Sequence, residues 1–293
     1  MIGDPTLYGK PEALADLAAN AQALVIRNKT RIDRQLLKQL PQLQAIGRLG
    51  VGLDNIDIAA CRERGVKVIA ARGCNANAVA EYVFACMLEH ARFLQRCDEA
   101  TREGHWNRLL CMGRELNGKT LGLIGVGDIG QRVATRARAF GMQVIAYDPF
   151  VIKTHSLIQD FGVRLDTLRQ VCREGDYISI HVPLTPATHS LIDEAQLAEM
   201  KETAVLINTA RGGIIHESAL HTSLQNHPNR YAFLDVREKE PPAADDPFRQ
   251  LPNVILTPHV AGITQESSQR VAEMIFEDID QVLQGQQVLT EVQ

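Results

Sequence analysis

Three kinds of side chain in the second half of the sequence could perform acid–base chemistry on a small anionic molecule. His259 offers an imidazole, a group that titrates near neutral pH and can move a proton in either direction. Arg211 offers a planar guanidinium, which matches a carboxylate through two parallel hydrogen bonds. An acid beside the histidine would orient its ring, and one short segment supplies Asp235, Glu238 and Glu240. Residue types alone do not choose among these acids, although Asp235 lies at an expected strand end.

A glycine-rich turn near the middle of the chain has the form of a dinucleotide-binding turn. The apolar run 121–124 indicates a buried strand before it, and a helical pattern that ends at Gly141 follows it. Gly125 permits the tight turn and Gly127 lets a pyrophosphate approach the backbone. Gly130 lets the helix pack closely on the strand, with the helix N-terminus facing the phosphates.

An acid at the end of the following strand favours NAD over NADP. The strand pattern 143–147 leads into Asp148, 18 residues after Gly130. A carboxylate there can accept hydrogen bonds from the adenosine ribose and would repel a 2′-phosphate. Asp128 argues against dinucleotide binding at this turn, because it places a negative charge beside the expected pyrophosphate unless its side chain points to solvent. The predicted cofactor is NAD.

Further apolar runs recur at regular spacing and predict a doubly wound parallel sheet. Helical patterns such as 194–200 and 217–225 separate them. In such sheets ligands bind beyond the carboxyl ends of the strands, where Asp148, Arg211 and His259 stand. The six expected strands are Leu121–Ile124, Gln143–Tyr147, Tyr177–Val182, Ala204–Asn208, Tyr231–Val236 and Val254–Leu256.

The first part of the chain alternates helices and strands and predicts a smaller parallel sheet without a glycine fingerprint. The amphipathic pattern 265–283 has no new strand to pair with, so we expect it to cross back to this first lobe. The predicted domains are residues 1–74 with 263–293 for substrate and 75–262 for NAD. A long apolar helix over 77–96 is expected either at a domain or subunit contact or in the core.

Composition excludes several classes of function. The 31 basic and 35 acidic residues give a net charge of −4 without a long basic run, so no nucleic-acid partner is expected. No apolar run approaches membrane-spanning length, so no membrane partner is expected. The six cysteines are scattered without a C-x-x-C pair or a metal-like cluster, which predicts reduced thiols, no metal and a cytoplasmic location.

Longer motifs across nearly the whole chain resemble the D-isomer-specific 2-hydroxyacid dehydrogenase family. Besides the glycine turn they are N-T-A-R-G-G from Asn208, L-D-V-R-E-K-E-P-P from Leu234, T-P-H-V-A-G from Thr257, G-R-L-G-V-G-L-D-N-I-D from Gly47 and H-V-P-L-T-P-A-T from His181. The resemblance implies an α/β fold of two doubly wound parallel-sheet lobes, with a Rossmann NAD-binding domain inserted into a smaller flavodoxin-like substrate domain. It also implies a homodimer through the NAD-binding domain, with the helix over 77–96 at the contact.

The same resemblance implies roles for individual residues. The catalytic set would be Arg211, Glu240 and His259, in which Glu240 hydrogen-bonds the imidazole and favours its protonated form. Asp235 would contact the nicotinamide carboxamide. The other implied cofactor contacts are Gly125, Gly127, Asp128, Ile129, Gly130, Asp148, His181, Val182, Thr209 and Ala210.

Within the family, C-M-G-R-E-L-N-G-K-T-L-G from Cys111 looks most like the 3-phosphoglycerate dehydrogenases. Arg27 and Arg48 match positions at which that branch holds the anionic tail of its substrate, and Val51 and Gly52 are assigned to the same substrate site. Positive charge at a strand-end cleft would favour a phosphate or sulfonate, and ordinary surface arginines are the alternative. The expected reaction is hydride transfer between NAD(H) and a 2-hydroxy or 2-oxo acid with an anionic tail, 3-phosphoglycerate first.

Three alternatives stay open. Two are enzymes of the same class, a 3-sulfolactate dehydrogenase and a glyoxylate or hydroxypyruvate reductase. The third is an NAD-sensing, corepressor-like binding protein. Family members usually begin with a strand and helix before the segment that resembles 23–26, so we expect a trimmed start or a smaller first sheet. The sequence stops soon after Gly285, so no C-terminal regulatory domain is expected.

Overall fold

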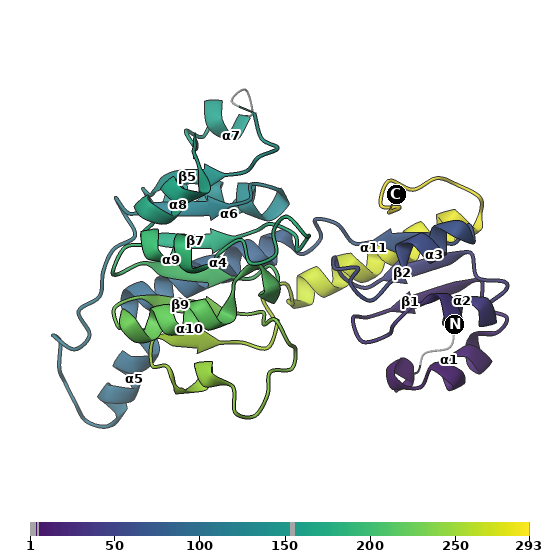
Figure 1. Cartoon of the computed structure of the whole chain (residues 1–293), viewed down its shortest axis with the longest axis horizontal. Coiled ribbons are helices and arrows are strands. Elements are labelled where there is room, and N and C mark those ends of the chain that lie inside the picture. The colour runs from purple at the N-terminus through teal and green to yellow at the C-terminus, as the bar shows by residue number, and fades with distance from the viewer. Residues whose placement is uncertain (1–3, 5, 153–155, 293) are drawn as a thin grey trace. The chain divides into compact units, whose positions relative to one another are not determined.

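Two parallel sheets, each in a unit of its own, organise the chain in the computed structural model (Figure 1). The structure describes residues 4, 6–152 and 156–292. The small unit is Met1–Asn75 with Ile263–Gln293, and the large unit is Ala76–Gly262.

The sheet of the large unit is doubly wound. In the described part of this unit seven parallel strands pair in the order β10-β9-β8-β7-β4-β5-β6. The order reverses between β4 and β7, and the carboxyl ends of these two strands therefore border the crevice in which such sheets bind ligands. The strands are β4 (Thr120–Ile124), β5 (Gln143–Tyr147), β6 (Arg164–Leu165), β7 (Tyr177–Ile180), β8 (Val205–Asn208), β9 (Tyr231–Leu234) and β10 (Val254–Leu256).

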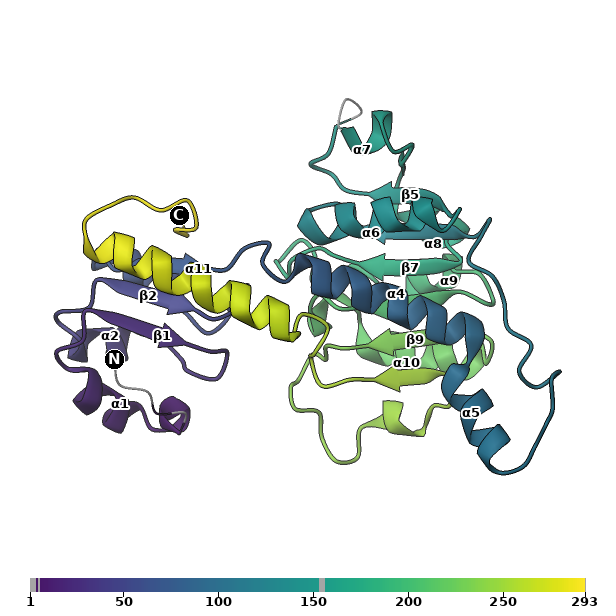
Figure 2. The ribbon, with the colours of Figure 1, turned by 180° about the vertical axis from the view of Figure 1, so that it is seen from behind.

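Helices cover both faces of this sheet. On one face α4 and α6 pack through Val83 and Val133 against Leu123, and Figure 2 shows these two helices in front of the strands. On the other face α8, α9 and α10 pack against β4, β7 and β8. The helices are α4 (Ala76–Arg92), α5 (Leu94–Arg102), α6 (Asp128–Ala139), α7 (Ser156–Gln159), α8 (Leu168–Glu174), α9 (Glu194–Glu199) and α10 (Glu217–Asn226), with short 3-10 helices η2 (Gly212–Ile214) and η3 (Pro247–Gln250).

The small unit has its strands in consecutive order, β1-β2-β3, all parallel among the residues described. One face packs on α11, and a Cβ at Gly47 would lie only 2.4 Å from Ile275 and 2.6 Å from Ile279 of that helix. The other face packs on α1, α2 and α3 through Ile46 and Val68. The elements are η1 (Leu7–Gly9), α1 (Pro11–Ala18), β1 (Ala23–Ile26), α2 (Arg34–Gln39), β2 (Ala45–Arg48), α3 (Ile58–Glu63), β3 (Lys67–Ala70) and α11 (Gln265–Leu283).

The predicted α/β class with parallel sheets is confirmed, and three details differ from the sequence pattern. The helix expected over 77–96 breaks at Phe93, whose φ of 51° cannot continue a right-handed helix. Strand β6 was not predicted, because its two residues, Arg164 and Leu165, are too few to form an apolar run. The order of the small sheet does not reverse, because the described residues before β1 form η1 and α1 rather than a strand.

Candidate active site

The glycine turn joins β4 to α6, and each glycine meets a different requirement. Gly125 has a φ of 93°, and a Cβ there would lie 2.9 Å from the His181 backbone. A Cβ at Gly130 would lie 2.3 Å from the Gly125 carbonyl oxygen. At Gly127 a Cβ would meet nothing within 4 Å, so this residue borders open space. Gly127 caps α6 without a side-chain hydrogen bond, which leaves the first N–H groups of the helix for an anion. Ile129 packs against the core of the sheet.

Asp148, at the end of β5, holds the turn in place. Its Oδ2 accepts a hydrogen bond from the Val126 N–H and its Oδ1 from the Phe150 N–H, both at 2.9 Å. Each oxygen keeps a second lone pair, so the carboxylate can still accept a ribose hydroxyl. The Asp128 side chain is 68% exposed and lies 3.8 Å from the Arg132 guanidinium on the same helix, which offsets part of its charge.

Two buried polar atoms at the next strand ends have no hydrogen-bond partner within the described residues. They are His181 Nδ1 and Thr209 Oγ1, whereas His181 Nε2 lies 2.9 Å from Ser179 Oγ. Burial lowers the pKa of His181 to about 3, so its ring is neutral at pH 7. Unpaired buried atoms cost free energy until a ligand or water satisfies them, and with the open space at Gly127 they fit a bound dinucleotide. Val182 and Ala210, two further predicted cofactor contacts, are partly buried against the core between the sheet and α8, α9 and α10.

The turn after β8 presents Arg211. The Asn208 amide closes this turn, since its Nδ2 donates to the Arg211 carbonyl at 2.9 Å and its Oδ1 accepts the Ala210 N–H at 3.0 Å. The Arg211 guanidinium donates to the Ala210 carbonyl at 2.7 Å through Nη1. A Cβ on Gly212 would lie 1.9 Å from the Arg237 carbonyl carbon, so the turn rests directly on the next loop.

Asp235, at the end of β9, organises the loop that carries His259. The carboxylate is 2% exposed and accepts the Val260 and Ala261 N–H groups, each at 2.8 Å. It also accepts the Thr257 hydroxyl at 2.6 Å. The Asp235 carbonyl accepts the His259 N–H at 2.8 Å. The predicted contact of Asp235 with nicotinamide stays a prediction, since the structure shows instead how this acid shapes the histidine loop.

Glu240 is the acid that the structure brings to His259. The two side chains are 37% and 43% exposed, and Glu240 Oε2 lies 2.8 Å from His259 Nδ1. An ionised carboxylate can only accept, so Nδ1 is the donor in this hydrogen bond. Oε1 of Glu240 accepts the Arg237 N–H at 3.1 Å. Sequence reasoning from residue types left Asp235, Glu238 and Glu240 open, and the geometry selects Glu240.

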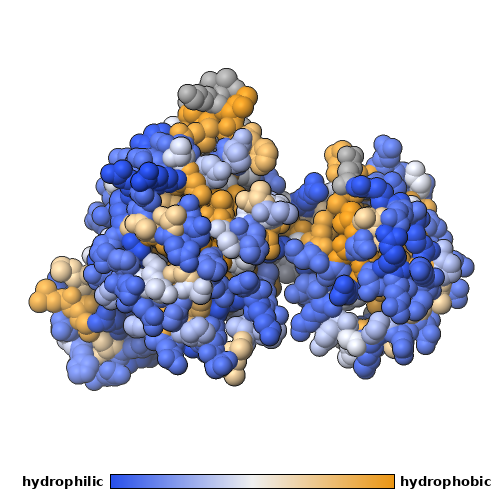
Figure 3. Space-filling view, viewed as in Figure 1, coloured by the Kyte–Doolittle hydropathy of each residue, from blue (hydrophilic) through white to orange (hydrophobic). Residues whose placement is uncertain are grey.

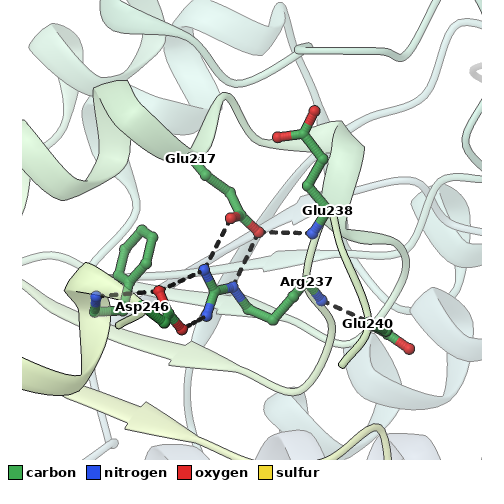
Figure 4. A network of polar contacts seen from close by, with 6 residues as sticks. Glu217, Arg237, Glu238, Glu240 and Asp246 are labelled. Carbon is green, nitrogen blue, oxygen red and sulfur yellow. Dashed lines mark hydrogen bonds and ion pairs between the residues drawn. The ribbon is translucent and has the colours of Figure 1, made fainter. Parts of the chain in front are cut away.

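The sequence analysis missed the ion-pair network beneath the Glu240 loop (Figure 4). The Arg237 guanidinium hydrogen-bonds both Glu217, the first residue of α10, and Asp246, the N-cap of η3. The two acids stand 20 and 9 residues away along the chain. No local spacing rule links residues at such separations, so only the fold reveals them.

The residues predicted for substrate binding lie in the small unit. Arg27 directly follows β1 and Arg48 is the last residue of β2, and Arg48 Nη1 donates to the Leu49 carbonyl at 2.6 Å. Val51 and Gly52 follow in the next loop, with Val51 39% exposed. Their part in substrate binding stays a prediction. In the described part of the chain no group of three or more His, Cys, Asp or Glu side chains could hold a metal ion.

Comparison with known proteins gives a consistent set of relatives. The sequence model of the D-isomer specific 2-hydroxyacid dehydrogenase NAD binding domain matches residues 84–261. The chain is 43% identical over 280 residues to the (S)-sulfolactate dehydrogenase of Chromohalobacter salexigens, covering 96% of the chain and 90% of that protein. It is 41% identical over 272 residues to the hydroxypyruvate reductase of Thermotoga maritima, covering 92% and 87%.

A D-3-phosphoglycerate dehydrogenase of Methanocaldococcus jannaschii is 42% identical over 276 residues, covering 94% of the chain. The chain spans only about half, 52%, of that relative. Among solved structures, the TT0316 protein of Thermus thermophilus superposes with a TM-score of 0.88 at 33% identity, covering all of this chain and 91% of that one. The D-lactate dehydrogenase of Aquifex aeolicus, solved with NAD and lactic acid, gives 0.83 at 32% identity, covering 92% and 85%.

Proposed function

The chain belongs to the D-isomer specific 2-hydroxyacid dehydrogenase family, and within that family we propose that it oxidises or reduces a small 2-hydroxy or 2-oxo acid that carries an anionic tail. The observation that carries the proposal is the hydrogen bond from His259 Nδ1 to Glu240, at 2.8 Å, beside the turn that presents Arg211. This arrangement supplies a proton donor and acceptor, a group that orients it and a carboxylate anchor.

The matched family domain binds NAD, so NAD is the cofactor, as the sequence predicts, and when bound it would supply or accept the hydride. Gly125, Gly127 and Gly130 would hold the pyrophosphate, with the first N–H groups of α6 donating to it. Asp148 would accept the adenosine ribose hydroxyls. Asp235 would contact the nicotinamide carboxamide, and the unsatisfied atoms of His181 and Thr209 are further proposed cofactor contacts. The remaining proposed contacts are Asp128, Ile129, Val182 and Ala210.

The chain's own residues then handle the substrate and its proton. We propose that Arg211 binds the substrate carboxylate through its planar fork. His259 would hold the proton on Nε2, give it to the carbonyl oxygen in reduction and take it back in oxidation. Glu240 would keep the ring turned and offset its positive charge at Nδ1. Reversal needs no other group, because the same imidazole serves both directions.

The proposed substrate is 3-phosphoglycerate, ahead of 3-sulfolactate. Arg27 and Arg48 at the ends of β1 and β2 support an anionic tail. The named relatives support both tails, since one is a phosphoglycerate dehydrogenase and one a sulfolactate dehydrogenase. A glyoxylate or hydroxypyruvate reductase is the second candidate, favoured by the relative from Thermotoga maritima.

Replacing His259 by Asn tests the reaction. The kcat of the variant should fall by a factor of about 10² to 10⁴, the usual contribution of a general acid or base. NADH binding, followed by fluorescence, should be unchanged. Initial rates are measured with 3-phosphoglycerate, 3-sulfolactate, D-lactate and D-glycerate, and with hydroxypyruvate in the reverse direction. Unchanged turnover in His259→Asn would refute the proposed role. NADH binding without turnover of any acid by the unmodified chain would favour the NAD-sensing alternative.

Replacing Arg48 by Ala tests the substrate tail. A preference for phosphorylated or sulfonated acids should collapse in this variant while rates on D-lactate change little. Arg31→Ala is the matched control, because Arg31 is also in the small unit and its side chain is 83% exposed. Equal rates on acids with and without a charged tail, unaffected by Arg48→Ala, would move the assignment to a general 2-hydroxyacid or glyoxylate reductase.

We also propose a homodimer formed through the large unit. Beyond α4 the chain exposes an apolar set that a second copy could cover, at Leu94 (64%), Trp106 (85%), Leu109 (78%) and Met112 (71%). Figure 3 shows apolar surface at the far end of the segment that follows α5. Leu109→Glu should yield monomers in light scattering, whereas Leu289→Glu, at an exposed site of the small unit, should not. A monomeric unmodified chain would refute the proposal.

The proposed location is the cytoplasm. All six cysteines are free thiols, which suits a reducing compartment. No helix in the part of the chain that the structure describes has the length and apolarity of a membrane span. Cell fractionation tests this assignment, and recovery of the protein outside the cytoplasmic fraction would contradict it.

A further inference from the structure

Resting on the proposed function, we infer that Arg237 is a positioning residue for the reaction. Its guanidinium is clamped between Glu217 and Asp246 (Figure 4). The clamp fixes the loop whose Glu240 carboxylate is hydrogen-bonded to His259. Arg237 therefore acts on the chemistry through Glu240 and touches neither the substrate nor the cofactor.

The clamp encloses the guanidinium almost completely. The Arg237 side chain is 9% exposed, and its Nε and Nη2 donate to the two oxygens of Glu217 at 3.0 and 2.8 Å. Nη1 and Nη2 donate to Asp246, the latter at 3.0 Å, and that carboxylate is 3% exposed. The Phe248 ring lies beneath the guanidinium, 4.6 Å from Cζ to the ring centroid. Since Arg cannot be exchanged for Lys in a two-sided planar clamp, the geometry specifies this residue type.

The main chain of Arg237 connects this clamp to both sides of the active site. Its N–H donates to Glu240 Oε1 at 3.1 Å, and the other oxygen of that carboxylate holds His259. Its carbonyl group lies where a Cβ on Gly212 would be, directly after Arg211. The following N–H, of Glu238, donates to Glu217 at 2.7 Å and ties the same segment to α10. A shift of Arg237 would therefore move the proton donor and the carboxylate anchor relative to each other.

The two acids take most of the donors of the Arg237 guanidinium. Four of its five N–H groups donate to Glu217 and Asp246, whereas Glu240 is bonded to the Arg237 main-chain N–H and to His259. The hydrogen bond from Arg237 holds the pKa of Asp246 below its usual range, and this carboxylate therefore stays ionised at working pH.

A double-mutant cycle tests the route through Glu240. Arg237→Lys keeps the charge and loses the fork, and Asp246→Asn keeps the cap of η3 and loses the charge. Each should lower kcat by about tenfold, as small misplacements of catalytic groups do, with the Kd of NADH unchanged. In a Glu240→Gln background, Arg237→Lys should cost nothing further, because the connection is already broken.

The control is Arg169→Met, which removes the exposed ion pair of Arg169 with Glu199 in the same unit and should leave kcat unchanged. If Arg237→Lys lowered kcat by the same factor with and without Glu240, the positioning role would be wrong. If Arg237→Lys and Asp246→Asn both lowered the melting temperature but left kcat unchanged, the clamp would stabilise the fold without positioning Glu240, and the inference would be wrong.

A second readout needs no turnover. A neutral His259 that donates to Glu240 carries its hydrogen on Nδ1, which nitrogen NMR of histidine-labelled protein distinguishes from the Nε2 tautomer. The free protein should show the Nδ1–H form at this residue, and Arg237→Lys should lose it. Retention of that form in the variant overturns the inference. Its loss in the variant, in a protein that turns over no 2-hydroxy acid, would refute the proposed function and leave the inference standing.

Discussion

His259 has a left-handed backbone conformation, with a φ of 57°, that residues other than glycine rarely adopt. Such a conformation costs on the order of 1 kcal/mol or more and persists only where neighbours hold it. Here the buried Asp235 carboxylate accepts the Val260 and Ala261 N–H groups that follow the histidine, each at 2.8 Å. One acid therefore offsets the strain and aims the ring at Glu240.

Gly127→Ala should separate cofactor binding from stability. The new Cβ would meet no atom of the chain within 4 Å, and the φ of −68° suits alanine. The melting temperature should therefore change by no more than about 2 °C. The methyl group would instead occupy the space proposed for the pyrophosphate, and the Kd of NADH measured by fluorescence should rise by about tenfold or more.

Gly9→Ala provides the comparison for this variant, because its Cβ also meets open space but lies in the small unit. It should alter neither property. If Gly127→Ala bound NADH as tightly as the unmodified chain, the pyrophosphate would have to lie elsewhere.

At the scale of elements, the small unit depends on the packing of α11 against β2. The residue that allows the approach is Gly47, because an added Cβ would lie 2.4 Å from Ile275 Cγ2 and 2.6 Å from Ile279 Cδ1. Gly47→Ala should destabilise this unit by about 1–3 kcal/mol, the usual cost of overpacking a core. Urea unfolding measures the effect, and an unchanged midpoint would show that α11 moves aside without cost.

The sequence predicted elements with strong periodicity better than those set by single residues. The helix 265–283 begins after Thr264, whose hydroxyl accepts the Ser267 N–H, and it ends before Gly285. Both signals are local and can be read from the sequence. No glycine or proline near Phe93 signals the break in the helix, so the break could not be predicted from local sequence. The Arg237 clamp joins residues from three separate segments, so no local pattern could reveal it.

At the scale of the whole molecule, two histidines with lowered pKa values, His90 and His181, should make stability depend on pH. Burial lowers the pKa of His90 to about 4 from its ordinary value of 6.5, and Arg114 adds to the shift. As pH falls below 6.5 the unfolded chain takes up a proton that the folded chain refuses until about pH 4. His90 therefore contributes stability that is fully present above pH 6.5 and is lost between pH 6.5 and 4, about 3 kcal/mol in all.

His90→Gln should flatten this dependence. The melting temperature of the unmodified chain should fall as pH drops from 6.5 to 4, and the variant should lose less over the same range. A residual slope is expected from His181, whose pKa is lowered to about 3. Parallel curves for the two proteins would show that His90 is protonated in the folded chain without penalty.

Because the small unit is built from the two ends of the sequence, its parts are synthesised at different times. The large unit is one continuous segment, whereas the small unit is split between residues 1–75 and 263–293. On the ribosome, β2 and β3 emerge early, but Val271, Ile275 and Ile279 of α11, which pack on the face formed by Ala45 and Ile69, are synthesised about 200 residues later. The nascent chain must therefore carry an uncovered apolar sheet face while the large unit folds, and this interval is when chaperone binding or aggregation would act on it.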